Sequence, residues 1–285
     1  MPIQSLTIAL AAFAVLGSPG RITKALQDGG RSAILQATSH LNSEQRADLE
    51  HTAERLADEG IQVVMYGDRG YPESLVINGK PIAPIPFYKG NSELFHRPSI
   101  GMCGSRNVSE LGLKPANSCG VEVANNSMVV VSGYAKGVDT ATHLAALESA
   151  GARVIVLAEG FDHFRIKQEF KSHFDWRRTL VVSQFAPSQP WKAFAAMARN
   201  GIIFGLARAL VVIEAGERGG TLAAGEGAMK LGRPVLVLDF GDSTPAGNFK
   251  LLNKGARPVH SVNDLRFVLR ELPRLRSEPV VEKLF

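Results

Sequence analysis

The amino-acid sequence predicts an α/β fold, in which a Rossmann-like, doubly wound and mostly parallel sheet follows a small helical N-terminal domain. Two observations predict it. After about residue 98, short apolar runs rich in β-branched residues alternate with helical patterns, as is typical of a parallel sheet covered by helices on both faces. Before a segment rich in Pro and Gly at residues 67–90, the pattern is mainly helical.

The first sixty residues contain helical segments separated by Gly, Pro and Asn, which interrupt helices. These segments are Leu6–Leu16, Ile22–Gln27, Arg31–Thr38 and Ser43–Asp58. Asn42 or Ser43 is expected to cap the last of them. The first segment is apolar like a signal-peptide core, but no basic residue precedes it and it is too short to span a bilayer. We therefore expect a buried helix there.

The rest of the chain predicts a strand at Ile61–Tyr66 and then the alternating part. The predicted strands of that part are Ser99–Cys103, Met128–Val131, Arg153–Leu157, Leu180–Ser183, Leu210–Ile213 and Val235–Asp239. The predicted helices are Leu113–Asn126, Thr140–Ala150, Phe164–His173, Trp191–Ala207 and Thr221–Leu231, and a last helix begins near Arg266.

Four parts of the chain are expected from this pattern. They are a helical module at 1–60, a Pro/Gly-rich junction with a first strand at 61–90, an α/β domain at 91–272 and a charged tail at 273–285.

The composition is ordinary for a globular protein, with 45% apolar and 21% charged residues among 285. Thirty-two basic residues against 27 acidic ones permit an anionic partner. The two cysteines, Cys103 and Cys119, lack a CxxC spacing. They therefore predict no metal site and no disulfide framework, and a reduced, cytoplasmic setting is the simplest interpretation.

The segment from Val129 to His143 is the most informative one. An apolar strand ends at Ser132-Gly133, a short loop carries Lys136 and Gly137, and an alanine-rich helix follows. Such a loop presents backbone N–H groups and the positive end of a helix dipole, which suits a phosphate. We expect Asp139 to be an N-cap and His143 to be packed or hydrogen-bonded, because no nucleophile lies near it in the sequence.

Two further strand ends carry similar chemistry. The first strand of the alternating part leads into Gly104-Ser105-Arg106, in which small residues permit close approach of a ligand and the guanidinium suits a phosphate. The strand at Leu210 leads into Gly219-Gly220-Thr221 and a helix. On neighbouring strands these loops would form one anion-binding floor. Because none of them has a Walker or dinucleotide-binding pattern, an NTPase or NAD enzyme is disfavoured and no cofactor is expected.

The segment Trp191–Leu206 is apolar at helical spacing, so most of it is expected in the core. The polar pair Arg199-Asn200 is the exception.

These motifs, in this order, resemble the DNA-processing protein A family (DprA, also called Smf). The resemblance covers about residues 61–260. Its pieces are Asp68-Arg69-Gly70-Tyr71-Pro72, Gly104-Ser105-Arg106, Ser132-Gly133 through Gly137-Val138-Asp139 to His143, Gly160-Phe161-Asp162, Arg199-Asn200, Glu214-Ala215, Gly219-Gly220-Thr221-Leu222, Gly232-Arg233, Gly247-Asn248 and Gly255-Ala256.

The resemblance implies a cytoplasmic, homodimeric and non-enzymatic protein that binds single-stranded DNA and loads RecA recombinase in natural transformation (competence). By that analogy Arg106 and Lys136 contact phosphates, Gly104, Ser105, Ser132 and Gly133 supply backbone amides, and Arg199 lines the same site. The full set of candidate DNA-binding residues adds Gly137, Lys192, Asn200, Gly219, Gly220 and Thr221. The resemblance also implies a helical N-terminal module of the SAM or helix–hairpin–helix kind. It implies no bound metal and no membrane partner.

The sequence departs from the family around Arg199. The family usually reads Phe-Pro-x-Arg-Asn-Arg where this chain has Ala196-Met197-Ala198-Arg199-Asn200-Gly201. An aromatic residue and a second arginine are therefore missing, and Lys192 and Phe194 are the nearby candidates to replace them. No winged-helix segment follows the α/β part, so we expect a divergent member.

Two other functions stay open at this level. The run from Glu217 to Glu226 resembles the Pro-Gly-Gly-x-Gly-Thr-x-x-Glu motif of nucleoside-monophosphate phosphoribohydrolases, although the glutamate spacing differs. A nucleotide-binding sensor or an N-glycosidase-like enzyme is therefore the alternative. A scaffold that binds only protein is the third hypothesis.

Overall fold

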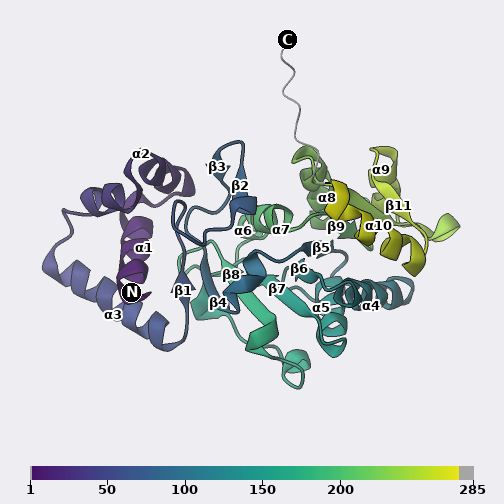
Figure 1. The fold of residues 1–285 in the computed structure, drawn as a ribbon, viewed down its shortest axis with the longest axis horizontal. Coiled ribbons are helices and arrows are strands. Elements are labelled where there is room, and N and C mark those ends of the chain that lie inside the picture. The colour runs from purple at the N-terminus through teal and green to yellow at the C-terminus, as the bar shows by residue number, and fades with distance from the viewer. Residues whose placement is uncertain (1, 276–285) are drawn as a thin grey trace, which may run out of the picture. The chain divides into compact units, whose positions relative to one another are not determined.

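The computed structural model describes residues 2–275 of the chain (Figure 1). Its contacts divide into two compact units. One unit comprises residues 1–96 and 154–206, and the other comprises residues 97–153 and 207–285. The predicted division at residues 60, 90 and 272 stays a prediction, and most of the predicted tail at 273–285 lies outside the described residues.

The first unit begins with three helices, α1 (Pro2–Leu16), α2 (Pro19–Ala37) and α3 (Ser43–Asp58). Leu6 in α1 is fully buried, which confirms the expected buried helix. Gly29 and Gly30 have non-helical dihedral angles, so the two helices predicted on either side of them are joined at a kink. Asn42 caps α3 through a capping box with Gln45, as one of the two expected caps. Within residues 2–275, no helix has both the length and the apolar character needed to cross a membrane.

The sheet of the first unit has the strand order β1-β4-β8-β7. These strands are β1 (Gln62–Val63), β4 (Phe87–Gly90), β8 (Thr179–Ser183) and β7 (Ala152–Val156), whose first two residues belong to the other unit. Strand β4 is antiparallel to both β1 and β8. The same unit contains the small hairpin β2 (Val76–Ile77) and β3 (Lys80–Pro81).

The junction at residues 61–90 differs from the prediction in two ways. The strand predicted at Ile61–Tyr66 is paired as a strand only at Gln62–Val63, and β4 was not predicted. Beyond β1, Val64 and Tyr66 donate to the carbonyl oxygens of Pro86 and Pro84. Because proline has no N–H, this stretch cannot form a regular ladder of hydrogen bonds. The same prolines argue against a strand in the sequence, which is why β4 was not predicted.

The second unit contains five parallel strands in the order β6-β5-β9-β10-β11. These are β6 (Val129–Ser132), β5 (Ser99–Cys103), β9 (Leu210–Val212), β10 (Val235–Leu238) and β11 (Arg257–Val259). Its helices are α4 (Glu110–Asn125), α5 (Val138–Glu148), α8 (Gly220–Lys230), α9 (Ala246–Asn253) and α10 (Val262–Leu275). This arrangement confirms the Rossmann-like, mostly parallel fold; β11 and α9 were not predicted.

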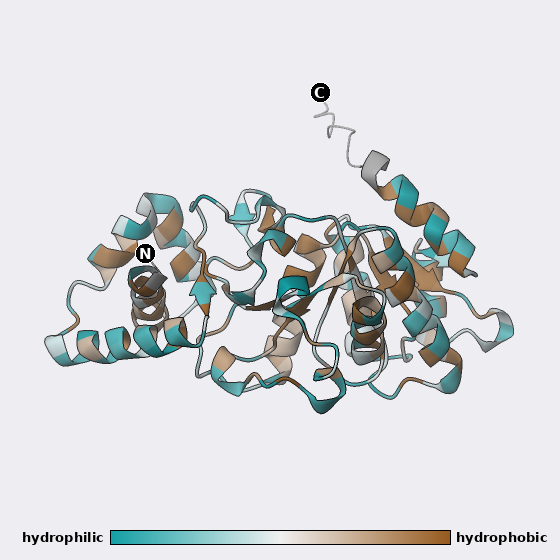
Figure 2. Cartoon of the chain, turned by 60° about the horizontal axis from the view of Figure 1, so that its bottom comes forward, coloured by the Kyte–Doolittle hydropathy of each residue, from teal (hydrophilic) through white to brown (hydrophobic). Residues whose placement is uncertain are grey.

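The core of the second unit lies where the strands meet the apolar faces of the helices. Ile100, Val130 and Val211 are fully buried at its centre. Figure 2 shows hydrophobic residues along the strands and mixed colouring on the helices. Helix α10 buries Leu265, Val268, Leu269 and Leu272, which recur at helical spacing.

Two predicted helices differ in the structure. The segment predicted at Phe164–His173 contains one short 3₁₀ turn, η4 (Gln168–Phe170), and lies between two others, η3 (Phe161–His163) and η5 (Trp176–Arg178). Of its apolar residues, only Ile166 and Phe170 stand at helical spacing, and one such pair is too short an apolar face to hold a helix on the core. The helix predicted at Trp191–Ala207 is instead α6 (Ala193–Ala198) and α7 (Asn200–Leu206), which meet at Arg199.

Candidate functional site

Three loops of the second unit follow the neighbouring strands β6, β5 and β9. They contact one another directly. The Thr221 hydroxyl donates to the carbonyl oxygen of Gly104 at 3.0 Å. The Val138 amide donates to the carbonyl oxygen of Ser105 at 3.1 Å. The expected floor of glycine-rich loops is therefore one connected surface in this unit.

Glycine is required in two of these loops by close approach. A Cβ atom on Gly104 would lie 2.4 Å from a methyl group of Val138. Gly137 has a φ of +73°, and a Cβ atom there would lie 2.3 Å from the carbonyl oxygen of Ser105. Gly104 therefore leaves room for the Val138 side chain, and Gly137 lets the main chains of the two loops approach each other directly.

Two helices begin at this surface with a glycine cap. The caps of α5 and α8 are Gly137 and Gly219, and neither has a side-chain hydrogen bond at the cap among the described residues. Both helices have eleven residues. Their first turns present the positive end of the helix dipole, which is a favourable environment for an anion.

Helix α4 begins at the same edge, but its N-terminus is occupied by protein. Ser109 caps it and accepts a hydrogen bond from the Gly112 amide at 3.1 Å. Glu214, at the end of β9, accepts from the Ser109 amide at 3.1 Å and from the Ser109 hydroxyl at 2.7 Å. A carboxylate already satisfies this helix. The first turn of α5 also contains a carboxylate, Asp139, whereas the first turn of α8 contains no acidic residue.

Exposed basic side chains belong to each of the three loops. Arg106 follows β5, Lys136 follows β6 and Arg218 follows β9, and all three are exposed. Gly219 and Gly220 are exposed beside Arg218. The sequence reading did not include Arg218; its position next to the glycine pair was the signal that could have found it.

Ser132 and Gly133 support the loop from inside rather than facing solvent, since both are buried. The Ser132 Oγ lies 2.7 Å from the Met102 carbonyl oxygen and 2.9 Å from Asp139 Oδ1. Asp139 Oδ2 accepts a hydrogen bond from the Ala135 amide at 3.1 Å. Asp139 is therefore structural, but it lies inside α5 and is not its N-cap.

His143 is fully buried, and its Nε2 lies 2.9 Å from the Gly133 carbonyl oxygen. Since a carbonyl oxygen can only accept, Nε2 carries the proton and donates this hydrogen bond. The expected packed and hydrogen-bonded histidine is confirmed.

Asn248 fixes the loop after β9. Its side chain is buried, accepts from the Ala215 amide at 2.8 Å, and donates to the carbonyl oxygens of Ile213 and Leu238 at 2.9 and 2.7 Å. The Gly247-Asn248 motif thus serves the site by holding the chain that leads to Gly219.

The remaining candidates, Lys192, Arg199 and Asn200, belong to the first unit. Arg199 is the C-cap of α6, and its Nη1 donates to the carbonyl oxygen of Val156 at 3.2 Å. The Lys192 Nζ lies 5.8 Å from the ring centre of Phe194, which is a cation–π distance.

The expected core position is confirmed after Arg199, where Ile202, Ile203, Phe204 and Leu206 are buried, but not for the large apolar residues before it. Trp191, Phe194 and Met197 are 51, 64 and 46% exposed. Since α6 has only six residues and of these only Ala195 is buried, its other side chains lie at the surface. An exposed aromatic therefore lies close to Arg199 in the sequence, although the family's aromatic position is Ala196.

Glu159 lies half-buried after β7 in the same unit. Burial raises the pKa of its carboxyl, and the positive charges of Arg199 and His163 offset part of that increase. The ionised form of Glu159 is therefore destabilised by burial, and Arg199, a candidate phosphate-binding residue, partly stabilises it.

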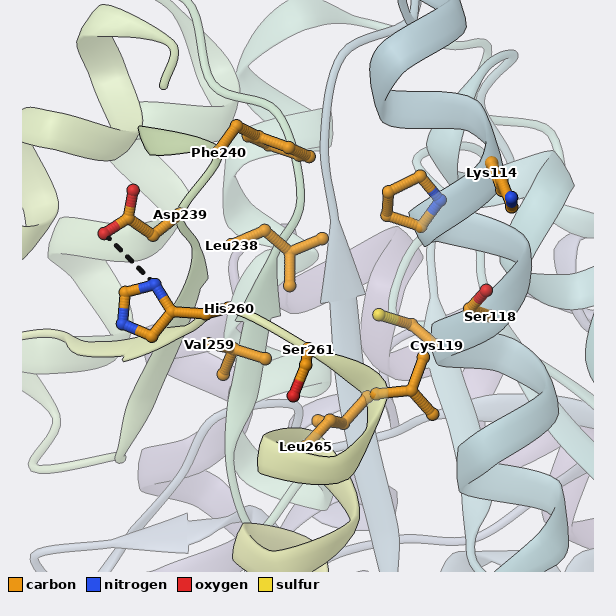
Figure 3. A pocket seen from close by; sticks show the side chains of 12 residues that line it. Lys114, Ser118, Cys119, Leu238, Asp239, Phe240, Val259, His260, Ser261 and Leu265 are labelled. Carbon is orange, nitrogen blue, oxygen red and sulfur yellow. Dashed lines mark ion pairs between the residues drawn. The ribbon is translucent and has the colours of Figure 1, made fainter. Parts of the chain in front are cut away.

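A pocket of about 250 Å³ lies elsewhere in the second unit, between α4 and the ends of β10 and β11 (Figure 3). Leu238, Val259 and Cys119 line it. His260 and Asp239 form an ion pair at its edge, with 3.5 Å between Nδ1 and Oδ2. Burial raises the pKa of the Cys119 thiol to about 12, so this thiol is unreactive at neutral pH. No predicted site residue lines the pocket.

Within residues 2–275 there is no group of three or more His, Cys, Asp or Glu residues that could hold a metal ion. Glu226, the glutamate of the phosphoribohydrolase-like run, forms an ion pair with Lys254 that lowers the pKa of its carboxyl.

A family model described as DNA recombination-mediator protein A matches residues 62–270. The chain belongs to this family. Among curated proteins, the DNA processing protein DprA of Streptococcus pneumoniae is 37% identical over 182 residues, which are 63% of this chain and 64% of the relative. That of Bacillus subtilis is 29% identical over 221 residues, covering 76% of this chain and 73% of the relative.

Solved structures of the DprA family agree in fold. The X-ray structure of DprA from Streptococcus pneumoniae matches with a TM-score of 0.70 and 29% identity, covering 91% of this chain and 94% of that one. A structure of DprA from Helicobacter pylori, which addresses its single-stranded DNA binding mode, has a TM-score of 0.65 at 20% identity and covers 74% of this chain and 96% of that one.

Proposed function

We propose that this DprA-family chain is a non-catalytic single-stranded DNA-binding protein that acts as a recombination mediator and loads RecA recombinase. One observation carries the proposal. Three loops joined by the hydrogen bonds Thr221 Oγ1 to Gly104 and Val138 amide to Ser105 leave two glycine-capped helix N-termini beside the exposed Arg106 and Lys136. Helix N-termini and exposed cations together favour phosphate groups.

A polymer fits this surface better than a free mononucleotide. Arg106, Lys136, Gly219 and Gly220 are all exposed, so the surface is open to a backbone that continues beyond it. The glutamate that the alternative N-glycosidase chemistry would need is held by Lys254. We therefore favour DNA binding over the nucleotide-sensor alternative.

The candidate residues take three roles in this proposal. Arg106 and Lys136 neutralise phosphates, while the loop glycines and Thr221 bring backbone amides close to the strand. Ser132, Gly133 and Gly137 hold the second loop in shape. In the first unit, Lys192, Arg199 and Asn200 contact the strand, and the exposed Phe194 ring stacks on a base.

Fluorescence anisotropy with labelled oligo-dT at several salt concentrations tests this binding. Each lost phosphate contact reduces the slope of log K against log salt by about 0.7 for a single strand. We expect that reduction for Arg106→Ala and for Lys136→Ala, with Lys24→Ala as a control at an exposed position of α2. Absence of binding at low salt, or competition by AMP at equal phosphate concentration, would contradict the proposal.

RecA loading, homodimerisation and a cytoplasmic setting follow from the family and are part of the same proposal. The rate at which RecA filaments form on single-stranded DNA should rise when the protein is added, and the Arg106→Ala variant should raise it less. Light scattering after gel filtration measures the oligomeric state, for which we expect two chains.

A further inference from the structure

The segment 165–178 contains a concentration of positive charge that the proposed site does not use. It holds Arg165, Lys167, Lys171, Arg177 and Arg178 against only Glu169 and Asp175. Its net charge is therefore +3, with His173 neutral, whereas the whole 285-residue chain has +5. Such a local excess attracts anionic polymers.

The end of this segment packs against β4 of the same unit and forms a defined group of side chains, which we call the Trp176 cluster: Lys89, Phe174, Trp176, Arg177 and Arg178. The Lys89 Nζ lies 4.8 Å from the centre of the Trp176 ring. The ring centres of Phe174 and Trp176 are 4.8 Å apart in an edge-on arrangement.

The main chain beneath the Trp176 cluster is fixed. The Asn91 side chain donates to the Arg177 carbonyl oxygen at 2.9 Å, and the Asn91 amide donates to the Thr179 carbonyl oxygen at 3.0 Å. Gly90 has a φ of +104°, and a Cβ atom there would lie 2.1 Å from the Thr179 carbonyl oxygen and 3.0 Å from the Trp176 ring. The basic side chains therefore project from an ordered support.

One carboxylate serves both arginines of the cluster. Asp175 lies 3.3 Å from the Nε of Arg177 and 3.3 Å from the Nε of Arg178. The Arg177 side chain is 90% exposed, so its guanidinium can still donate hydrogen bonds to a phosphate. Arg177 therefore keeps an exposed positive charge beside the carboxylate that it shares with Arg178.

We propose that the Trp176 cluster is a second contact for the phosphate backbone of single-stranded DNA, separate from the loops after β5, β6 and β9. This inference rests on the proposed function. A flexible single strand can follow an irregular basic surface, and arginine guanidiniums pair with phosphate oxygens in a bidentate manner. A membrane surface fits less well, because Trp176 is packed between Lys89 and Phe174 and does not project for insertion.

The test compares the triple variant Lys89→Gln, Arg177→Gln, Arg178→Gln with a matched triple variant, Arg21→Gln, Lys24→Gln, Lys80→Gln. The control removes the same charge from exposed positions on α2 and β3 of the same unit. Anisotropy is measured over a salt series with oligo-dT of about 10 nucleotides, within the size of a single-module site, and with an oligo-dT several times longer. Melting temperatures establish that both variants fold.

With the long oligonucleotide, we expect the cluster variant to reduce the slope of log K against log salt by about two, from about 0.7 for each of three contacts. The control should change it by much less. An Arg177→Glu variant should weaken binding further.

The outcomes separate the two proposals. If the unaltered protein does not bind oligo-dT, the proposed function fails. If it binds and Arg106→Ala weakens it, but the cluster variant matches the control, only the second contact is wrong. If the cluster variant instead loses binding to phosphatidylglycerol vesicles and keeps its DNA slope, the surface binds membranes and the inference is overturned.

Discussion

The loops after β5, β6 and β9 and the segment Trp191–Asn200 are both candidate DNA contacts, but they are built differently. In the loops, the contacts are made to main-chain atoms: the Thr221 hydroxyl donates to the Gly104 carbonyl oxygen, and Gly137 packs on the Ser105 carbonyl oxygen. In the segment, two short helices meet at Arg199, and Trp191, Phe194 and Met197 are exposed.

This difference explains where the sequence departs from its family. Substitution in the loops displaces main chain that other loops need, so those motifs are retained in this chain. Substitution on α6 changes exposed side chains and leaves the fold unchanged. The missing family aromatic at Ala196 therefore costs the fold nothing, while the exposed Phe194 offers a ring two residues earlier.

The largest effect is expected from Gly137→Ala. The new Cβ would overlap the Ser105 and Arg106 carbonyl oxygens, and the φ of +73° is unfavourable for alanine. Strain and overlap together should lower the free energy of unfolding by about 3–5 kcal/mol and weaken oligo-dT binding. Urea unfolding measures the first effect and anisotropy the second.

Two neighbouring glycines serve as controls for that substitution. Gly219→Ala meets no atom within 4 Å but has a φ of +114°, so it should cost only the strain, about 1–3 kcal/mol. Gly220→Ala meets no atom and has no positive φ, so it should be nearly neutral. Equal losses in all three variants would contradict the importance of main-chain contact.

The next effect is expected from Asn248→Ala. It leaves the Ala215 amide and the carbonyl oxygens of Ile213 and Leu238 without their side-chain partner in a buried place. We expect a loss of about 2–4 kcal/mol in unfolding free energy, because unsatisfied buried polar groups are costly. Asn253→Ala, at the end of the same helix, is the control. A similar loss of unfolding free energy in that variant would show that the three hydrogen bonds of Asn248 do not explain the effect.

A smaller and more selective effect is expected from Phe194→Ala. The exposed ring contributes little to folding, so the melting temperature should not change. Removing a stacked base is worth about 1–3 kcal/mol of binding, so the affinity for oligo-dT should fall about five- to hundred-fold. Met197→Ala, also exposed on α6, is the matched control; unchanged affinity for Phe194→Ala would show that this ring does not stack.

The smallest effect is expected from Glu159→Gln. Burial raises the pKa of Glu159 above its unfolded value, so this group favours the folded state at low pH, and that contribution is lost as the pH rises through the folded pKa. The variant should therefore melt higher than the unaltered protein at pH 7 and no higher at pH 3. A scan of melting temperature against pH checks this, and a lower melting temperature at pH 7 would mean that attraction to Arg199 outweighs burial.

The fold could be predicted where apolar β-branched runs alternate with helical spacing. The strand at Ser99–Cys103 was placed at its observed bounds. By contrast, β4 follows Pro84 and Pro86, which have no amide hydrogen and are unusual beside a strand. Ile166 and Phe170 are four residues apart and suggest a helix that the structure does not form. These failures come from local composition that tertiary hydrogen bonds override.

The site could be predicted as separate loops but not as a joined surface. The strand order that places β5 between β6 and β9 depends on contacts far apart in the sequence, and no local pattern encodes it. For the same reason Glu214 was noticed as a motif without its role, since its partner Ser109 is 105 residues away. The exposure of Trp191 and Phe194 was missed because apolar residues at helical spacing usually indicate a core.

The contact between Gly137 and the Ser105 carbonyl also limits how this protein can change over generations. An insertion in either loop would separate atoms that now touch, so the loop lengths cannot vary without loss of the surface. The side chains of Arg106, Lys136 and Arg218 are exposed, and none of them lies at such a glycine contact. New ligand preferences can therefore arise by single exchanges at these three positions while the underlying frame is inherited intact.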